Sequence, residues 1–215
     1  ACVANTSEDG SSTVWSSSQG QFQVRNYSAM VCGMDISKIR VIPAEIGGGF
    51  GGKTTIYLEP LAIVLSKKAG KPVKLVMARE DVFRATGPTS GGHAVAKIGA
   101  KKDGTLVAGE LTMEYEAGAF AGSPVQFGCM TGFAPYAIEN VKAVGYDVVV
   151  NRPKVAAYRA PGAPVAAFAV ESVLDELARK LGIDALTLRM KNAAKEGTQA
   201  AYGPKFGRIG YVETL

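Results

Sequence analysis

The stretch "EIGGGFGGKTT", residues 45–55, surrounds Phe50 with five glycines and follows them with Lys53 and two threonines. Glycine has no side chain and adopts positive φ readily, so such a run lets another molecule approach the backbone closely. Read from Gly47, the stretch also fits G-x-x-x-x-G-K-[ST], the pattern whose backbone amides cradle nucleotide phosphates. It therefore predicts a binding loop for a nucleotide or for a larger phosphorylated cofactor. A glycine-rich turn packed on a neighbouring strand is the purely structural alternative.

The sequence around this loop argues against a P-loop enzyme. Such enzymes need an apolar strand that ends in Asp, which holds the magnesium ion. The best candidate, "VKLVMARED" at residues 73–81, reaches Arg79 and Glu80 before Asp81. Hairpin-like segments follow, instead of the alternating strands and helices of a doubly wound parallel sheet. We therefore expect the loop to bind something other than ATP or GTP.

Composition limits the class of protein. The chain has 215 residues, of which 47% are hydrophobic, enough for a packed core in one large or two small domains. Its net charge of +5 suits nucleic acid, an acidic partner or a phosphorylated ligand. No nucleic-acid-binding module accompanies this charge, so we expect no nucleic-acid partner. No apolar run has the length of a transmembrane helix, so we also expect no membrane association.

The cysteines and the histidine restrict the metal chemistry. Cys2, Cys32 and Cys129 lie far apart without a C-x-x-C pair. This pattern argues against a disulfide framework or a zinc site and fits a reducing, cytoplasmic compartment. His93 is the only histidine, so this chain cannot supply a multi-histidine metal site. We interpret His93 as a hairpin residue and Cys129 as an ordinary buried thiol.

The spacing of apolar residues predicts an α+β (mixed α/β) fold. Helices are expected at residues 19–33, 54–69, 164–181 and 184–194. Strands are expected as two runs within residues 1–18, at 35–46, at 72–79, as a hairpin over 91–120, and at 141–153. An irregular glycine-rich segment is expected from 117 to 135. Both ends look cut, because the chain opens on strand-like residues without Met and closes on "GYVETL" without a helix.

Three segments resemble the molybdenum hydroxylase family, which includes xanthine dehydrogenase, aldehyde oxidase and carbon monoxide dehydrogenase. "GGGFGGK" after a strand is similar to the family's signature loop. "AAYRAPGAPVAAFAVESVLDELARKLGIDALTLRMKN", residues 156–192, resembles its Arg-containing loop, long helix and "R-x-K-N" ending. "TVWSSSQGQFQVRNYSAMVCG", residues 13–33, resembles its strand leading to a Gln and a helix. The segments follow the family's order and spacing, and the resemblance covers essentially the whole chain.

The resemblance implies how a cofactor is held. In this family molybdenum is carried by molybdopterin, usually the cytosine dinucleotide form in bacteria, and the protein gives the metal no direct ligand. A Gln donates a hydrogen bond near the metal without adding charge, bare glycine amides approach the pterin, and an Arg offsets anionic oxygen. The cofactor-binding residues that match are Gln19, Gly48, Gly49, Phe50, Gly51 and Arg159.

The resemblance also implies a substrate pocket, for which Phe50, Phe127 and Pro161 are the candidates. Xanthine-oxidising members often have an acidic residue where this chain has Thr54, an Arg near the position of Phe127, and a Phe in place of Pro161. The carbon monoxide enzymes carry a cysteine that "YRAPGAP" lacks. These departures favour an aldehyde or an aromatic acid, thioester or heterocycle over a purine.

Each implied site residue has a structural interpretation as well. Gln19 suits an exposed strand end, and Phe50 suits a core position. Arg159 suits a surface ion pair with Glu171 or Asp175. The places of these side chains in the fold distinguish the two interpretations.

For the whole chain, the resemblance implies that residues 1–215 form the first subdomain of a molybdopterin-binding domain, truncated at both ends. The enzyme would hydroxylate its small-molecule substrate with water and pass electrons to 2Fe-2S clusters and FAD on partner domains or subunits. The family's catalytic Glu lies beyond the equivalent of Leu215, so no catalytic residue is assigned and the isolated chain is expected to be inactive. A P-loop nucleotide-binding domain and a non-catalytic scaffold fragment remain as alternatives.

Overall fold

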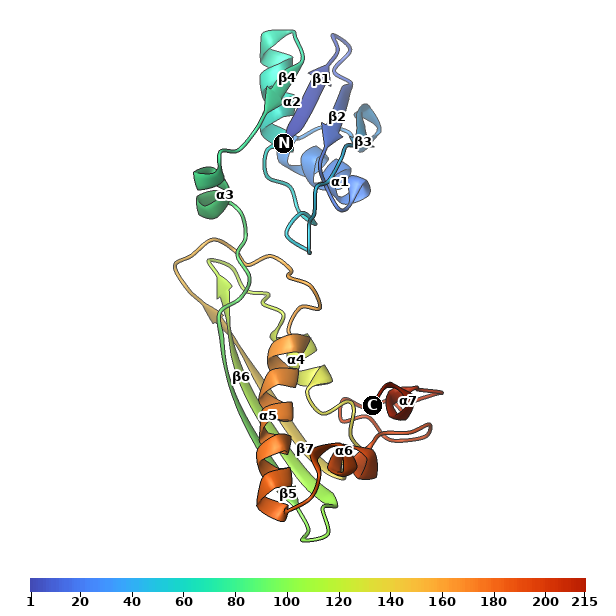
Figure 1. Cartoon of the computed structure of the whole chain (residues 1–215). Coiled ribbons are helices and arrows are strands. Elements are labelled where there is room, and N and C mark those ends of the chain that lie inside the picture. The colour runs from blue at the N-terminus through green and yellow to red at the C-terminus, as the bar shows by residue number, and fades with distance from the viewer. The chain divides into compact units, whose positions relative to one another are not determined.

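The computed structural model describes residues 1–215, and its internal contacts divide the chain into two compact units. Unit 1 comprises Ala1–Thr89 and Arg152–Arg159, and unit 2 comprises Ser90–Asn151 and Ala160–Leu215. Each unit has its own sheet with helices packed on it (Figure 1). The predicted α+β fold class is confirmed. None of the helices is both long and apolar enough to cross a lipid bilayer.

Unit 1 is built on a four-stranded sheet with the order β3-β2-β1-β4. Its elements are β1 (Cys2–Thr6), β2 (Ser12–Ser16), α1 (Gln21–Cys32), a 3-10 turn η1 (Ile36–Lys38), β3 (Ile39–Pro43), α2 (Glu59–Ala69), β4 (Val73–Leu75) and α3 (Arg79–Ala85). β1 pairs antiparallel with β2 and β4, whereas β2 and β3 run parallel and are joined through α1. α1 and α2 contact each other and the sheet. The core that they bury includes Cys2, Ala4, Val14, Ala29, Ile39, Ala62 and Ile63.

Unit 2 is built on a three-stranded sheet with the order β5-β6-β7. Its elements are β5 (Gly92–Ala100), β6 (Leu106–Gly118), α4 (Val125–Thr131), β7 (Asn140–Val149), α5 (Ala163–Leu181), α6 (Ala185–Asn192) and α7 (Tyr211–Thr214). β5 and β6 form the expected antiparallel hairpin, and β7 joins β6 in parallel. The long helix α5 lies along the sheet (Figure 1). Its buried residues, Ala166, Val170, Leu174 and Ala178, recur every four positions and form one apolar face.

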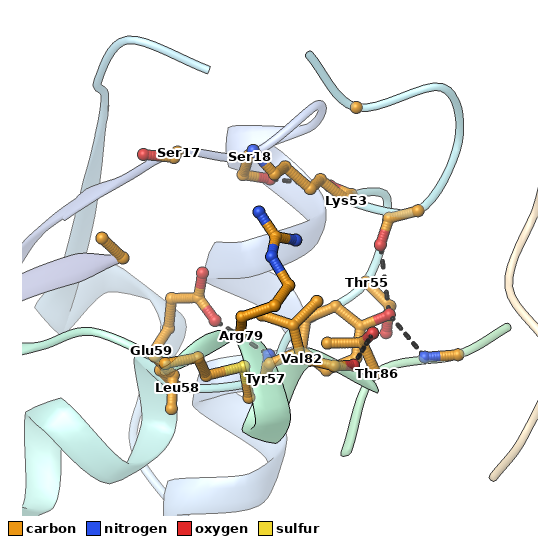
Figure 2. A pocket seen from close by; sticks show the side chains of 15 residues that line it. Ser17, Ser18, Lys53, Thr55, Tyr57, Leu58, Glu59, Arg79, Val82 and Thr86 are labelled. Carbon is orange, nitrogen blue, oxygen red and sulfur yellow. Dashed lines mark hydrogen bonds between the residues drawn. The ribbon is translucent and has the colours of Figure 1, made fainter. Parts of the chain in front are cut away.

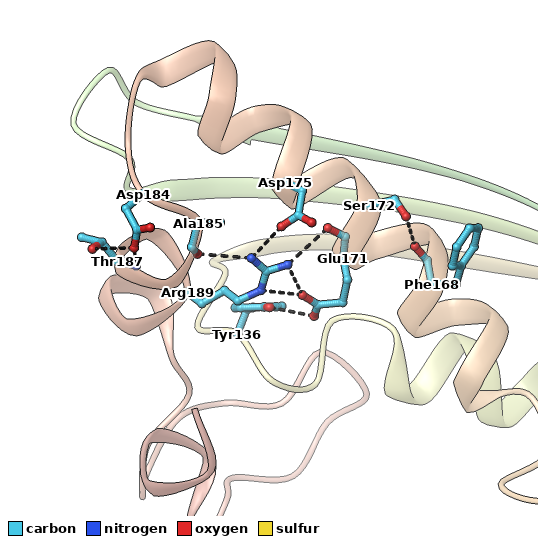
Figure 3. Close-up of polar contacts among 9 residues, drawn as sticks. All are labelled: Tyr136, Phe168, Glu171, Ser172, Asp175, Asp184, Ala185, Thr187 and Arg189. Carbon is cyan, nitrogen blue, oxygen red and sulfur yellow. Dashed lines mark hydrogen bonds and ion pairs between the residues drawn. The ribbon is translucent and has the colours of Figure 1, made fainter.

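The "R-x-K-N" ending of the second motif ties α6 to the rest of unit 2. Figure 3 shows the Arg189 guanidinium between two carboxylates of α5, at 2.8 Å from Glu171 and 2.8 Å from Asp175. The Tyr136 hydroxyl donates to the other oxygen of Glu171 at 2.7 Å. Burial and the negative charge of Glu171 raise the pKa of Tyr136 well above its usual value, so this hydroxyl stays a donor. The motif's arginine is therefore structural.

The motif's last residue, Asn192, is buried and satisfies backbone groups of the hairpin turn. Its amide oxygen accepts the Leu106 N–H at 2.9 Å, and its amide nitrogen donates to the carbonyl oxygens of Gly104 and Leu188. A buried amide with all these partners stabilises the turn, because leaving such groups unpaired costs about 1–3 kcal/mol each.

Four sequence predictions about elements were wrong, and the first three concern α2, β4 and the last residues of the chain. The helix expected from residue 54 begins at Glu59, because Pro60 favours the first helical turn and residues 54–58 bond back to the glycine loop. The strand expected at 72–79 stops at Leu75 and is followed by α3, whose start is capped by the Asp81 carboxylate accepting the Ala78 N–H. The chain's last residues, expected without a helix, form the short helix α7.

The segment 117–135, expected to be irregular, contains α4. Its glycines serve close packing: a Cβ on Gly128 would lie 2.8 Å from the Met113 side chain, and one on Gly132 would lie 2.5 Å from Leu111. The absence of side chains thus lets α4 lie directly against β6. Glycine richness was taken as a loop signal, whereas here it marks close contact between a helix and a sheet.

Candidate functional site

The parallel pair β2–β3 brings the first motif and the glycine loop together. Ser12 pairs with Ile39 and Ser16 with Pro43, so both strands end at the same edge of the sheet. Gln19 follows the end of β2, and the glycine loop follows the end of β3. In sheets with parallel strands, ligands bind at the carboxyl ends of the strands, where such loops meet.

Gln19 is bonded to the glycine loop through its side chain and its backbone. Its Oε1 accepts the N–H of Gly51 at 2.9 Å and the N–H of Lys53 at 3.0 Å. Its own N–H donates to the Lys53 carbonyl oxygen at 2.9 Å. Because both loop amides point at Oε1, the exposed Nε2 of Gln19 is left as a donor without an acceptor in the chain. Gln19 is therefore more than an exposed strand end.

The loop passes so close to its neighbours that side chains would not fit. A Cβ on Gly49 would lie 2.4 Å from the Gln19 side chain. Gly51 has φ of +97°, and a Cβ there would lie 2.5 Å from the Ala157 carbonyl oxygen. The glycines are thus required both for backbone conformation and for packing against two other segments.

The Arg-containing segment joins the loop through the backbone. The N–H of Arg159 donates to the Phe50 carbonyl oxygen at 2.9 Å. Phe50 has φ of +51° and Ala160 has φ of +54°, and these are the only non-glycine residues with positive φ. Strained conformations of this kind cost about 1–3 kcal/mol and cluster at ligand sites. The Phe50 ring is 63% exposed, so the interpretation of Phe50 as a core residue is wrong.

The loop presents a set of N–H groups that lack acceptors. The amides of Gly51, Gly52, Lys53 and Thr54 all donate to oxygens of the chain. Those of Gly48–Phe50 donate to none. Adjacent unbonded N–H groups on a bare backbone suit the oxygen and nitrogen acceptors of a bound cofactor. The residues present therefore fit a group such as molybdopterin.

A cavity of about 360 Å³ lies beneath the loop (Figure 2). Gly49, Gly52 and Lys53 form part of its wall, together with residues of α2, α3 and the segments next to them. The Arg79 side chain extends into the space between Ser18 and Glu59, and no ion pair joins it to that carboxylate. Sequence reasoning did not identify this cavity, because the spacing of its residues suggested only helix and strand positions.

The other predicted pocket residues belong to unit 2. Phe127 lies on α4 and is 56% exposed, and Pro161 is half-buried in the turn before α5. Gly162, next to Pro161, packs tightly on α4, since a Cβ there would lie 2.3 Å from the Pro124 carbonyl oxygen. The Tyr115 hydroxyl donates to the Gly162 carbonyl oxygen at 3.1 Å. Unit 2 thus fixes Pro161 and Phe127 on adjoining segments.

The structure bears on the structural interpretations of Arg159 and His93. Glu171 and Asp175, the suggested partners of Arg159, bind Arg189 instead. His93 is an exposed residue of β5, with its Nδ1 3.6 Å from a Glu114 oxygen, as expected for a hairpin position.

Cys129 is a half-buried free thiol, and burial raises its pKa. It is therefore less readily ionised than an exposed cysteine. Cys2 and Cys32 are also free thiols, so none of the three cysteines takes part in a disulfide bond.

The geometry around Lys53 argues against a P-loop. In that motif the Lys-Ser/Thr pair opens a helix and the ammonium reaches the phosphates. Here α2 begins only at Glu59, and the Lys53 ammonium donates to the Ile46 carbonyl oxygen at 2.5 Å. The ammonium therefore closes the glycine loop upon itself.

Comparison with known families matches residues 1–193 to the molybdopterin cofactor-binding domain. The chain belongs to this family. The resemblance seen in its three motifs is confirmed, whereas nothing supports a nucleotide-binding domain. In this molybdopterin cofactor-binding domain, the N–H groups of Gly51 and Lys53 both donate to Gln19 Oε1.

Related proteins extend the comparison. The xanthine dehydrogenase molybdenum-binding subunit of Escherichia coli O157:H7 is 34% identical over 88% of this chain and 26% of its own length. The nicotinate dehydrogenase large molybdopterin subunit of Eubacterium barkeri is 32% identical over 99% of this chain and 51% of its own length. The chain thus spans between a quarter and about half of these relatives.

Solved structures agree with the family. The aldehyde oxidoreductase of Desulfovibrio gigas superimposes with a TM-score of 0.91 and 31% identity, over 99% of this chain and 24% of that chain. The carbon monoxide dehydrogenase of Oligotropha carboxidovorans superimposes with a TM-score of 0.84 and 28% identity, over 97% of this chain and 27% of that chain. The fold of this molybdopterin cofactor-binding domain is therefore shared with oxidoreductases.

Proposed function

We propose that Gln19, the glycine loop and Arg159 hold a molybdenum cofactor in an oxidoreductase that hydroxylates an aldehyde or an aromatic or heterocyclic substrate with water. The observation that carries this proposal is the pair of hydrogen bonds from the loop to Gln19 Oε1. The pair leaves Gln19 Nε2 as a free donor, beside the unbonded amides of Gly48–Phe50. Residues 1–215 serve in this proposal as one cofactor-binding region.

Each group of the chain has a specific task. The amides of Gly48, Gly49 and Phe50 bind acceptor atoms of the pterin, and Gln19 Nε2 donates toward the metal centre without adding charge. Arg159, whose position is set by its backbone bond to Phe50, brings a permanent positive charge that offsets anionic oxygen. The bound cofactor supplies the redox-active metal for hydroxylation by water. No residue of this chain is assigned as the base.

The substrate side is formed by apolar groups. Phe50 in unit 1 and Phe127 in unit 2 are both exposed, and each ring offers a face on which a flat substrate stacks. Pro161 is a further apolar group, in the turn before α5. Neither Thr54 nor these residues carries a charge, which favours an aldehyde or a neutral aromatic ring at the reacting end. The names of relatives that act on nicotinate and aldehydes support this class of substrate.

The remaining parts of the assembly follow from the same proposal. The cofactor is molybdopterin in its cytosine dinucleotide form, and the remainder of the molybdenum subunit completes its site. Partner domains or subunits with 2Fe-2S clusters and FAD remove the electrons. The three free cysteines support a reducing, cytoplasmic location.

The test is a pair of glycine substitutions in the purified enzyme. Gly49→Ala places a Cβ 2.4 Å from Gln19 and should lower the bound molybdenum, measured by elemental analysis, at least about tenfold, which corresponds to about 1.4 kcal/mol. Gly207→Ala is the control, because a Cβ there meets nothing within 4 Å. Equal molybdenum content in Gly49→Ala and Gly207→Ala would contradict the cofactor role of the loop and support the alternative of a non-catalytic scaffold.

A further inference from the structure

Glu59 is the one carboxylate among the buried polar residues of this chain, with 8% of its surface exposed. It has no ion-pair partner. Its Oε1 accepts the Ser16 hydroxyl at 2.6 Å, and its Oε2 accepts the Tyr57 N–H at 2.9 Å. A buried charge is costly unless its hydrogen bonds are strong and well placed, so its retention at this position needs a reason.

The two partners of Glu59 lie on either side of the glycine loop in the sequence. Ser16 is the last residue of β2, three positions before Gln19. Tyr57 lies in the segment that leads from the loop to α2. The carboxylate thus joins the segment that carries Gln19 to the segment that leaves the loop, and it does so beside the cavity in Figure 2.

Tyr57 connects the loop to a third segment. Its hydroxyl donates to the Gly52 carbonyl oxygen at 3.1 Å and accepts the Gly87 N–H at 3.3 Å. Gly87 in turn packs against the returning segment of unit 1, since a Cβ there would lie 2.6 Å from the Lys154 carbonyl oxygen. One phenol therefore links the loop to residues that are distant in sequence.

We propose that Glu59 and Tyr57 are positioning residues that hold the glycine loop in the conformation presenting its free amides. The inference deepens the proposed function, on which its connection with a cofactor rests. Each of the residues Gly47–Gly51 has a positive φ or an N–H without a hydrogen bond, so the loop has little intrinsic preference for one conformation. Two residues that follow the loop set its conformation. Glu59 acts through its bonds to the Ser16 hydroxyl and the Tyr57 N–H, and Tyr57 acts through the bond of its hydroxyl to the Gly52 carbonyl oxygen.

Three variants of the 215-residue chain separate these contacts. Tyr57→Phe keeps the ring and removes only the hydroxyl. Glu59→Ala removes both carboxylate bonds, whereas Glu59→Gln keeps them, because its amide oxygen accepts the Tyr57 N–H and its amide nitrogen donates to the Ser16 hydroxyl. Tyr27→Phe is the matched control, since Tyr27 is 41% exposed on α1, away from the loop contacts.

The measurement is amide hydrogen exchange by NMR at Gly51 and Lys53, the two amides bonded to Gln19. Exchange there should accelerate about fivefold in Tyr57→Phe and Glu59→Ala, as expected for losing net hydrogen-bond stabilisation in a local opening. It should stay within about twofold of the parent in Glu59→Gln and Tyr27→Phe. Amides of β1 and β2 should be unchanged, which distinguishes loop positioning from general destabilisation.

Unchanged exchange at Gly51 and Lys53 in Tyr57→Phe would overturn the proposal, and so would equal acceleration in Glu59→Gln and Glu59→Ala. If Glu59→Ala does not fold, Tyr57→Phe still decides. The exchange experiment needs no cofactor, so it is independent of the molybdenum content that tests the proposed function. Accelerated exchange together with unchanged molybdenum in Gly49→Ala would support positioning and refute the cofactor role.

Discussion

At the scale of single residues, this molecule uses backbone atoms where many sites use side chains. The loop presents the unbonded amides of Gly48–Phe50, Arg159 joins the loop through its N–H, and Gln19 is the side chain that accepts the loop's N–H groups. Backbone contacts are insensitive to residue type except where a Cβ would collide, as at Gly49 and Gly51. A substitution that removes only the Arg159 side chain should therefore leave the backbone bond to the loop intact.

The substitution Arg159→Ala separates the role of the Arg159 backbone from the role of its guanidinium. Arg159→Ala keeps the N–H bonded to the Phe50 carbonyl oxygen and removes only the guanidinium. In the purified enzyme we expect a normally folded protein whose turnover falls at least about tenfold, or about 1.4 kcal/mol of transition-state stabilisation. Steady-state kinetics measures this, with the exposed Arg208→Ala as the control. Unchanged turnover would reduce Arg159 to a structural residue.

Cys2 should resist alkylation and make the fold sensitive to alkaline pH. Burial in the core of unit 1, with a smaller effect from the charge of Glu59, raises the pKa of this thiol from 9.0 to about 11. At pH 8 its thiolate fraction is about a hundredfold lower than that of an ordinary thiol, so labelling by iodoacetamide should be slower in the folded chain than in urea by at least that factor. The stability linked to this shift is present below pH 9 and is lost as pH rises toward 11. Mass spectrometry measures the rate at which Cys2 is labelled. Rapid labelling of Cys2 in the folded chain would contradict this prediction.

At the scale of elements, the sequence predicted correctly the helices and strands that depend on the spacing of neighbouring residues. The apolar spacing predicted α1 and α5 closely, and the Lys-Asp-Gly turn predicted the β5–β6 hairpin. The start of α2 was wrong because residues 54–58 bond to the loop, a contact that propensity does not register. α4 was missed because its glycines pack on β6 and resembled loop residues.

Only part of the candidate cofactor site could be predicted from the sequence. The convergence of Gln19, the loop and Arg159 came from the family resemblance, since no local pattern links positions so far apart. Tyr57 and Glu59 were counted as helix residues, although a Glu directly before Pro60 is a signal for a helix start. What remained hidden was the tertiary contact of that Glu with Ser16.

The junction of α5 and α6 should depend strongly on Arg189. Its side chain is 15% exposed and binds Glu171 and Asp175, so Arg189→Leu leaves two partly buried carboxylates without their cation. We expect a loss of about 2 kcal/mol in the free energy of unfolding, below the roughly 3–5 kcal/mol of fully buried pairs because Asp175 is half-exposed. Urea denaturation measures the loss. Arg84→Ala, which breaks the exposed pair with Glu80, is the control and should cost less than about 0.5 kcal/mol.

At the scale of the whole molecule, the chain combines two units with separate cores, each centred on its own sheet. The unbonded amides of Gly48–Phe50 belong to unit 1, whereas Phe127 and Pro161 belong to unit 2. This difference between the units follows from the fold. In unit 1 the parallel pair β2–β3 brings unbonded backbone N–H groups to one edge of the sheet, whereas in unit 2 α4 and the turn before α5 present apolar side chains.

Unit 1 is also discontinuous, since Arg152–Arg159 returns to it after the three strands of unit 2. On the ribosome, the segment that contacts Gly51 and bonds Phe50 is made several seconds after the loop itself, at about 5–20 residues per second. Until then the loop lacks one of its three neighbours, and the Phe50 carbonyl oxygen lacks the Arg159 N–H that it accepts. The order of synthesis thus delays completion of the loop's surroundings until β5, β6 and β7 have been translated.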